Sequence, residues 1–121
     1  MATLSEEAKS VIAEIHPGYV ATADKNGRPN VSAKGSYRVL DDQHILFADV
    51  NSPRTIANLQ ENPQVSAIVL DPATRRSCRV WGRATVLSAG ELLDQVNAGL
   101  AARNMSAKHV VVIDVDEFAV S

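Results

Sequence analysis

The chain has 121 residues, the length of one ordinary domain, and its 12 basic and 14 acidic residues give a net charge of −2. Its 45% hydrophobic and 21% charged residues exclude a disordered chain, and no apolar run approaches the ~18 residues of a membrane span. The acidic first residues are not a signal peptide and the single cysteine, Cys78, cannot form an internal disulfide, so we expect a cytoplasmic protein. Because only 4% of the residues are aromatic, the core should be light and aliphatic.

The first half of the chain predicts one short helix and then a succession of strands. Thr3 to Glu6 has the spacing of a capping box that would begin the helix, and His16-Pro17-Gly18 would end it. Asn26-Gly27 is the strongest short signal for a hairpin, and Asp41-Asp42 marks a second turn. The segments between these signals are expected to form a helix at 8–15 and strands at 19–23, 30–34 and 44–49, with the chain continuing extended from 30–34 through 36–40.

The second half adds two helices and three strands. Ser52 is a good N-cap and Pro53 suits the first helical position, which predicts a helix of about two turns that ends at Asn62-Pro63. Ser88 to Glu91 is a second capping box at the start of another helix. The strands are expected at 65–70, 77–87 and 109–115.

Together these elements predict a mainly β fold with three short helices. We count about six strands, and the frequent hairpins favour antiparallel pairing in a small barrel. No repeat, linker or low-complexity tract interrupts the chain. Residues 1–121 are therefore expected to form a single domain.

The most informative segment for function is the predicted helix start at residues 52–58. A helix N-terminus offers unpaired N–H groups and a partial positive charge, and both favour anions. Ser52 and Thr55 add hydroxyl donors, and Arg54 adds a forked cation suited to phosphate oxygens. Lys34, beside Gly35 at the end of a predicted strand, could bring a second positive charge. By spacing alone, a capped helix with a solvated arginine explains the segment as well.

Six short motifs follow one another between residues 18 and 87. They are Gly-Tyr-Val-Ala-Thr at 18–22, Asn-Gly-Arg-Pro at 26–29, Val-Ser-Ala-Lys-Gly-Ser-Tyr at 31–37, Arg-Thr-x-x-Asn-Leu at 54–59, Asn-Pro-x-Val at 62–65 and Trp-Gly-Arg-Ala at 81–84. In this order the chain resembles the split β-barrel family that binds flavin mononucleotide (FMN) and includes pyridoxamine 5′-phosphate oxidase. The resemblance implies a six-stranded antiparallel split barrel that forms a homodimer, with FMN at the interface.

The same resemblance implies a role for eleven residues of this chain. The ribityl phosphate would be held by Arg54 and Thr55, helped by Ser52 and Asn58. The remaining assignments place Ser32, Ala33 and Lys34 alongside the flavin ring, Ala48 and Asp49 at its edge, and Trp81 and Arg83 at the partner's site. Whether Lys34 faces the ring or the phosphate stays open.

The implied function is that of an electron-transfer flavoprotein or an oxidoreductase that acts on a small substrate. The alternatives are a reductase of the same fold that uses a deazaflavin, and a flavin-binding or storage protein without catalysis. In each case the ring would carry the redox chemistry while the protein binds and tunes it, so no catalytic side chain is expected.

Other residues predict neither a metal site nor a nucleic-acid interface. His16, His44 and His109 lack ligand spacing, and Cys78 fits a small core residue. The alternation of Arg79, Trp81 and Arg83 could suit a nucleic acid, but the net charge of −2 and the few aromatic residues disfavour one. We therefore expect a small-molecule partner and no nucleic acid or membrane.

Overall fold

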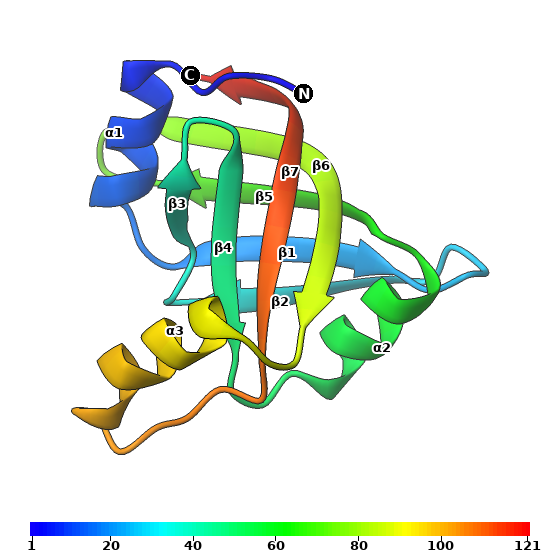
Figure 1. The fold of residues 1–121 in the computed structure, drawn as a ribbon. Helices are drawn as coiled ribbons and strands as arrows, with labels where there is room; N and C mark the ends of the chain where they lie inside the picture. Colours follow the sequence, from blue (N-terminus) through cyan, green and yellow to red (C-terminus); the bar gives the residue numbers. More distant parts are fainter.

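The computed structural model describes all of residues 1–121 and contains seven strands and three helices (Figure 1). The count of six strands was wrong, because a turn at Gly35–Tyr37 makes the following short strand an independent element. The elements are α1 (Glu6–Glu14), β1 (Gly18–Ala23), β2 (Pro29–Lys34), β3 (Arg38–Asp41), β4 (His44–Asp49), α2 (Pro53–Glu61), β5 (Gln64–Leu70), β6 (Ser77–Leu87), α3 (Glu91–Ala101) and β7 (His109–Val120).

All seven strands belong to one sheet in the order β2-β1-β5-β6-β7-β4-β3, and every neighbouring pair is antiparallel. The sheet curls into a half-barrel, with α1, α2 and α3 placed around its rim (Figure 1). This confirms the mainly β, antiparallel fold. Its two edge strands, β2 and β3, follow each other in the chain, so the turn between them links the two edges of the sheet.

Two helix starts differ from the expected capping boxes. Helix α1 is capped by Ser5, whose Oγ accepts a hydrogen bond from the Ala8 amide at 3.1 Å, because the chain before it is extended and Leu4 is buried in the core. Helix α3 has Gly90 at its N-cap with φ of 110°, a conformation that disfavours side chains, and no side chain caps it. The caps predicted at Thr3 and Ser88 were therefore wrong.

The last strand also continues five residues beyond the expected end at Val115. Strand β7 runs to Val120 because its second part pairs with the first part of β6, from Cys78 opposite Val120 to Trp81 opposite Glu117. The register shifts between Trp81 and Gly82, so the two halves of this long pair meet at a bulge.

The hydrophobic core has two parts, which β4 separates. Ile45 and Phe47 point into the main core inside the curl of the sheet, whereas Leu46 and Ala48 pack with Val96 of α3 on the other face. Strand β4 is consequently buried on both faces. Most of the core is aliphatic, as the composition predicts, with Tyr37 and Phe47 as its fully buried aromatic side chains.

Candidate functional site

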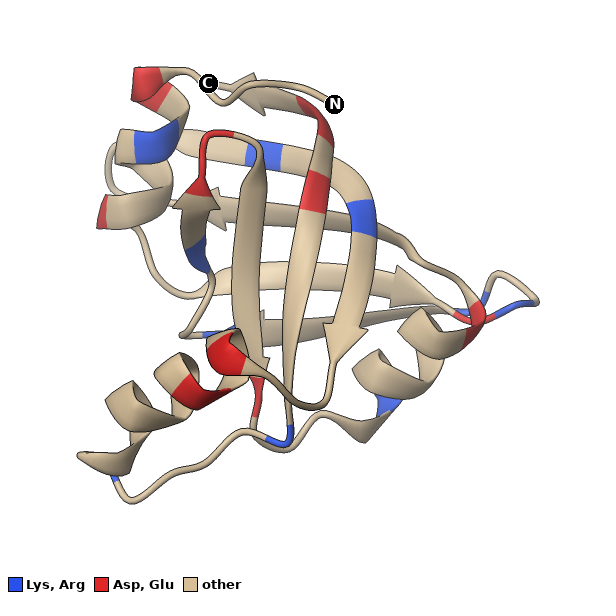
Figure 2. Cartoon of the chain, in the orientation of Figure 1, with Lys and Arg blue, Asp and Glu red and all other residues tan.

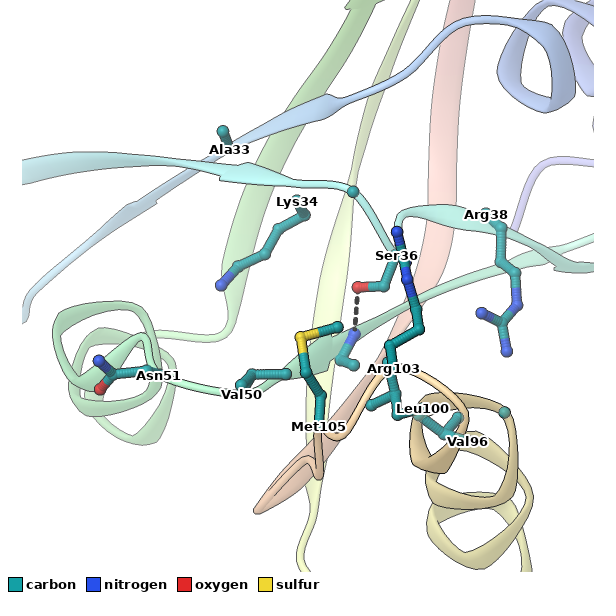
Figure 3. Close-up of a pocket in the computed structure, with 13 residues that line it drawn as sticks. Ala33, Lys34, Ser36, Arg38, Val50, Asn51, Val96, Leu100, Arg103 and Met105 are labelled. Atoms are coloured by element: carbon teal, nitrogen blue, oxygen red, sulfur yellow. Dashed lines mark hydrogen bonds between the residues drawn. The ribbon is translucent and has the colours of Figure 1, made fainter.

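A cleft of about 510 Å³ lies where the ends of β2 and β4 face α3 (Figure 3). Three of the predicted site residues, Ala33, Lys34 and Ala48, line it. Ser36 fixes the turn at its rim, since the Ser36 hydroxyl accepts a hydrogen bond from the Ala48 amide at 2.8 Å. The ends of β2 and β4 and the C-terminal half of α3 thus form the walls of one open site.

Lys34 is a nearly buried cation without a counterion. It is 8% exposed, its Nζ lies 5.7 Å from the centre of the Phe47 ring, and no carboxylate lies within 4.0 Å of it. Burial lowers the pKa of Lys34, although the negative charge of Asp49 opposes this. A buried ammonium group at the edge of a cleft is stabilised by an anionic ligand.

Asp49 organises the connection between β4 and α2. Its Oδ1 accepts hydrogen bonds from the Ser52 amide at 2.8 Å and the Ser52 hydroxyl at 2.7 Å, and its Oδ2 lies 2.7 Å from His109 Nδ1. Burial alone would raise the pKa of Asp49, but the hydrogen bonds from His109 and Ser52 outweigh it and keep the pKa below its ordinary value. Both carboxylate oxygens of Asp49 therefore already have hydrogen-bond partners within the protein. The edge of a flavin could contact Asp49 only next to these two oxygens.

We expect Asp49→Asn to lower the free energy of unfolding by about 1–3 kcal/mol at neutral pH, because the buried hydrogen bonds to a charged acceptor are weakened. A carboxyl whose pKa is lowered on folding stabilises the protein above its unfolded pKa, near 3.8, and loses that contribution as the pH falls through the folded pKa. Urea unfolding at neutral and successively more acid pH measures this. The difference in the free energy of unfolding between Asp49→Asn and the parent protein should shrink as the pH falls below about 3.8.

The exposed Asp94 offers a matched control, since Asp94→Asn removes the same charge from the surface of α3. It should change stability by a few tenths of a kcal/mol. A difference between Asp49→Asn and the parent protein that stayed constant into strong acid would contradict the role given to the ionised carboxylate.

Helix α2 begins without a side-chain cap. Ser52 occupies the N-cap position as predicted, but its hydroxyl donates to Asp49, and Pro53 has no amide hydrogen. The amides of Arg54 and Thr55 have no acceptor in the protein, and the first helical amide bond runs from Ile56 to the Ser52 carbonyl. The N-terminus of α2 thus keeps two free donors.

Thr55 adds a third donor without a partner at this helix start. The residue is 1% exposed, and its Oγ1 has no hydrogen-bond partner. A buried hydroxyl left unpaired costs about 1–3 kcal/mol. Free amides and an unpaired hydroxyl in the first turn of a helix form a site suited to an anion.

Arg54 and Asn58 face a second, mainly polar hollow of about 290 Å³ between α2 and the hairpin that joins β1 to β2. Arg28 and Asp24 line it from the hairpin, so the hollow has two arginines and one carboxylate among its lining residues. Asn58 Nδ2 donates to the hydroxyl of Thr22 at 3.1 Å, which fixes α2 against β1. The formal charge of its lining residues is therefore +1, beside the free end of the helix.

The inner face of β2 connects the polar hollow to the cleft. Asn30 lines the hollow, Lys34 lines the cleft, and Ser32 lies between them on the same face. Alternate residues of a strand lie nearly 7 Å apart, so this polar face extends over about 13 Å. An elongated ligand with an anionic end can therefore contact the helix start and the cleft together.

Trp81 and Arg83 lie elsewhere in this subunit. They belong to the face of β6 opposite the core, where Arg83 Nε lies 3.7 Å from Asp116, and Trp81 lines a shallow hollow of about 330 Å³ with Tyr19 and Val31. Neither residue lines the cleft or the polar hollow. A single copy of the chain therefore does not bring these two residues together with the other predicted site residues.

Several cleft residues were not predicted from the sequence. Four of them lie within four residues of a predicted site residue, so a wider search around these motifs would have found them: Ser36, Arg38, Val50 and Asn51. The others belong to α3 and the loop after it, and only the folded chain brings them to β2. They are Val96, Gly99, Leu100, Arg103 and Met105.

Two further findings limit the kinds of site in the molecule. No group of three or more His, Cys, Asp or Glu residues is placed to hold a metal ion. None of the three helices has the length and apolar character needed to cross a membrane.

Comparison with known sequences identifies one family and one relative. The sequence profile of the family described as pyridoxamine 5′-phosphate oxidase matches residues 4–120. An uncharacterised protein of Methanocaldococcus jannaschii is 34% identical over 104 residues, which cover 82% of this chain and 68% of that protein.

Solved structures share the whole fold. A protein from Lactobacillus delbrueckii provisionally named a pyridoxamine 5′-phosphate oxidase is 26% identical with a TM-score of 0.83, over 97% of this chain and 93% of its own. HupZ of Group A Streptococcus is 24% identical with a TM-score of 0.88, over 95% and 91% of the two chains. An FMN-binding protein of Syntrophomonas wolfei is 23% identical with a TM-score of 0.84, over 95% and 84%.

Structures with other named functions have the same architecture. An F420 reductase has a TM-score of 0.73 at 20% identity, and the heme storage protein HutZ of Vibrio cholerae has a TM-score of 0.69 at 24% identity. At these identities the likeness concerns the fold. The fold alone therefore does not select the ligand, and the side chains of the site must do so.

Proposed function

This chain belongs to the pyridoxamine 5′-phosphate oxidase family, and we propose that it is a flavoprotein that binds one FMN per subunit. The observation that carries this proposal is the start of α2, where the amides of Arg54 and Thr55 and the hydroxyl of Thr55 have no partner. The residues present fit a phosphate there, because they offer several donors and a nearby guanidinium group.

In this proposal the phosphate end of FMN is held by the first turn of α2, Arg54 and the polar hollow with Asn58. Ser52 acts indirectly, since its hydroxyl is committed to Asp49 and leaves the amides of the helix free. The inner face of β2, with Asn30 and Ser32, supplies hydrogen-bonding groups for the ribityl chain. The FMN-binding protein of Syntrophomonas wolfei, which shares the fold, supports FMN as a candidate ligand.

The ring of FMN would lie in the cleft, against Ala33, Lys34 and Ala48. When bound, a flavin supplies the hydride- and electron-transfer chemistry, and the protein orients it and tunes its electronics. Lys34 is then the cation beside the ring rather than at the phosphate, because it lines the cleft and not the polar hollow. Its positive charge would stabilise negative charge that develops at the ring on reduction.

We also propose that a second copy of the chain covers the outer face of β1, β2, β5 and β6. This face carries unusually exposed apolar side chains, with Val31 67% exposed and Tyr19 44% exposed, around the hollow lined by Trp81. Covering them would remove apolar surface from water, which is favourable. Such a homodimer would bring Trp81 and Arg83 toward the partner's flavin.

The test is titration of the purified protein with FMN, followed by the visible absorption spectrum and by quenching of flavin fluorescence. Saturation near one FMN per chain, with a dimer in sedimentation of the same sample, is the expected result. A protein that takes up no FMN refutes the proposal. Saturation by a deazaflavin in place of FMN would favour the reductase alternative, for which the F420 reductase of the same fold is the relevant likeness.

If FMN binds, turnover separates an oxidoreductase from an electron carrier or storage protein. The loaded, reduced protein is mixed with a panel of small oxidants, and the return of the flavin absorption is followed. An oxidoreductase is expected to reoxidise rapidly with one class of substrate. Slow reoxidation by every compound would favour a carrier or storage role.

A further inference from the structure

The α3 side of the cleft is not used by the proposed contacts to FMN. It is lined by Arg38 of β3, by Val96 and Leu100 of α3, and by Arg103 and Met105 of the following loop. We call these five residues the α3 subsite. It shares one cleft with Lys34, so a ligand bound there would lie next to the proposed position of the flavin ring.

Arg38 and Arg103 bring two positive charges to this subsite without counterions. No carboxylate lies within 4.0 Å of either guanidinium group, and none of the residues that line the cleft is acidic. Figure 3 shows Arg103 reaching from the end of α3 toward Ser36, on the side of Arg38, whereas Lys34 points toward Asn51. The cations of the cleft therefore fall into two groups, one at each end.

The position of Arg103 follows from how α3 ends. Asn104 adopts φ of 55°, a left-handed conformation typical of a helix C-terminus, and the amides of Arg103 and Met105 both bond to the Leu100 carbonyl. This turn directs the chain back over the cleft. With the bond from the Asn104 amide to the Ala101 carbonyl, it pairs the carbonyls of Leu100 and Ala101, which reduces their repulsion of an anion.

The charge of the subsite is opposite to that of the molecule, whose net charge is −2. The acidic residues of α3, Glu91 and Asp94, lie in its first turn (Figure 2). The helix has 11 residues and is about 16 Å long, so these acids are more than a Debye length from Arg103 at physiological salt. A local positive potential in a concave site attracts anions.

The same subsite has an apolar wall. Val96 is buried beneath it, Leu100 is half-buried, and Met105 is 37% exposed with its flexible thioether at the cleft. Apolar walls with a few convergent charged groups are the usual make-up of a small-molecule site. A purely polar anion would leave this wall in contact with water.

We infer that the α3 subsite is a second ligand site, next to the proposed flavin, for a small molecule with an apolar body and one anionic headgroup. Its place beside the ring rests on the proposed function, and its ligand is then the substrate of the flavoprotein. Arg38 and Arg103 bind the headgroup, a carboxylate or a phosphate, and are specificity-determining residues. Val96, Leu100 and Met105 contact the body.

The experiment is isothermal titration calorimetry of the FMN-loaded protein with three probes that share a phenyl ring: benzoate, phenyl phosphate and benzamide, the neutral isostere of benzoate. Saturable binding of at least one anion, at least tenfold tighter than benzamide, is expected. The tighter of the two anions identifies the headgroup. Arg38→Gln and Arg103→Gln should each weaken that anion about fivefold, as expected for solvent-accessible charge pairs.

Arg75→Gln is the matched control, because Arg75 lies in the exposed turn between β5 and β6, away from the cleft. FMN affinity is measured on every variant and should stay unchanged. Equal binding of benzoate, phenyl phosphate and benzamide, no saturable binding of either anion, or equal losses in Arg75→Gln and the two subsite variants would overturn the inference. If FMN does not bind, the proposed function fails separately, and the same titrations of the flavin-free protein still test the subsite.

Discussion

The double variant Arg54→Gln and Thr55→Val is expected to bind FMN at least a hundredfold more weakly than the parent protein, while riboflavin binding changes less than threefold. Hydrogen bonds to a charged group contribute about 1.5–3 kcal/mol each, and 1.4 kcal/mol corresponds to a factor of ten in affinity. The variant removes a guanidinium group and a hydroxyl, both beside the free amides of α2. Riboflavin lacks the phosphate and so loses nothing there.

Thr55→Val is chosen because the buried side chain keeps nearly its shape while it loses the unpaired hydroxyl. Folding should therefore be unaffected or slightly improved, and thermal unfolding checks this. Fluorescence titrations of both ligands against the parent protein, the double variant and Arg75→Gln give the comparison. Equal weakening of FMN and riboflavin would show that these residues do not hold the phosphate.

Gly82→Ala is expected to destabilise the fold by about 3 kcal/mol or more. A Cβ at this position would lie 2.2 Å from the backbone oxygen of Asp114 and 2.9 Å from Cγ2 of Ile113. The residue lies at the bulge where the register of β6 and β7 shifts, so the two backbones can approach this closely only if no side chain intervenes. Overpacking against backbone cannot be relieved by a change of rotamer.

Gly99→Ala provides the opposite case within the same chain. Gly99 is helical, and a Cβ there would meet no atom within 4 Å. Alanine in a helix interior is favoured over glycine by up to about 1 kcal/mol, so this variant should be more stable than the parent protein. Chemical denaturation of both variants measures the two effects, and a Gly82→Ala protein as stable as Gly99→Ala would refute the steric argument.

The Trp-Gly-Arg-Ala motif illustrates what a sequence pattern can and cannot tell. Its alternation correctly placed Trp81 and Arg83 on the face opposite Val80 and Ala84. The reason for Gly82 was not visible, because it depends on the close approach of β7, a strand far away in the chain.

At the predicted phosphate site, too, local sequence signals predicted one part of the structure, and contacts between distant residues decided the other. The local signals for the start of α2 were sufficient to place Ser52 and Pro53 correctly, since capping preferences act within a few residues. That Ser52 instead donates to Asp49, and so leaves the helix amides unpaired, depends on His109 of β7 holding the same carboxylate. The assignments to FMN, from Ser32 to Arg83, remain predictions that the proposed titrations test.

Sequence periodicity, turn residues and motif order determined the mainly β architecture, the antiparallel pairing, most strand boundaries and the family. These properties follow from interactions between residues close together in the chain and from alternating burial. Tertiary structure alone decided that Lys34 lies in the cleft and apart from Arg54, and that Arg38 and Arg103 share a subsite. The curl of the sheet and the end of α3 bring these groups together, and such long-range placement is not encoded in any local pattern.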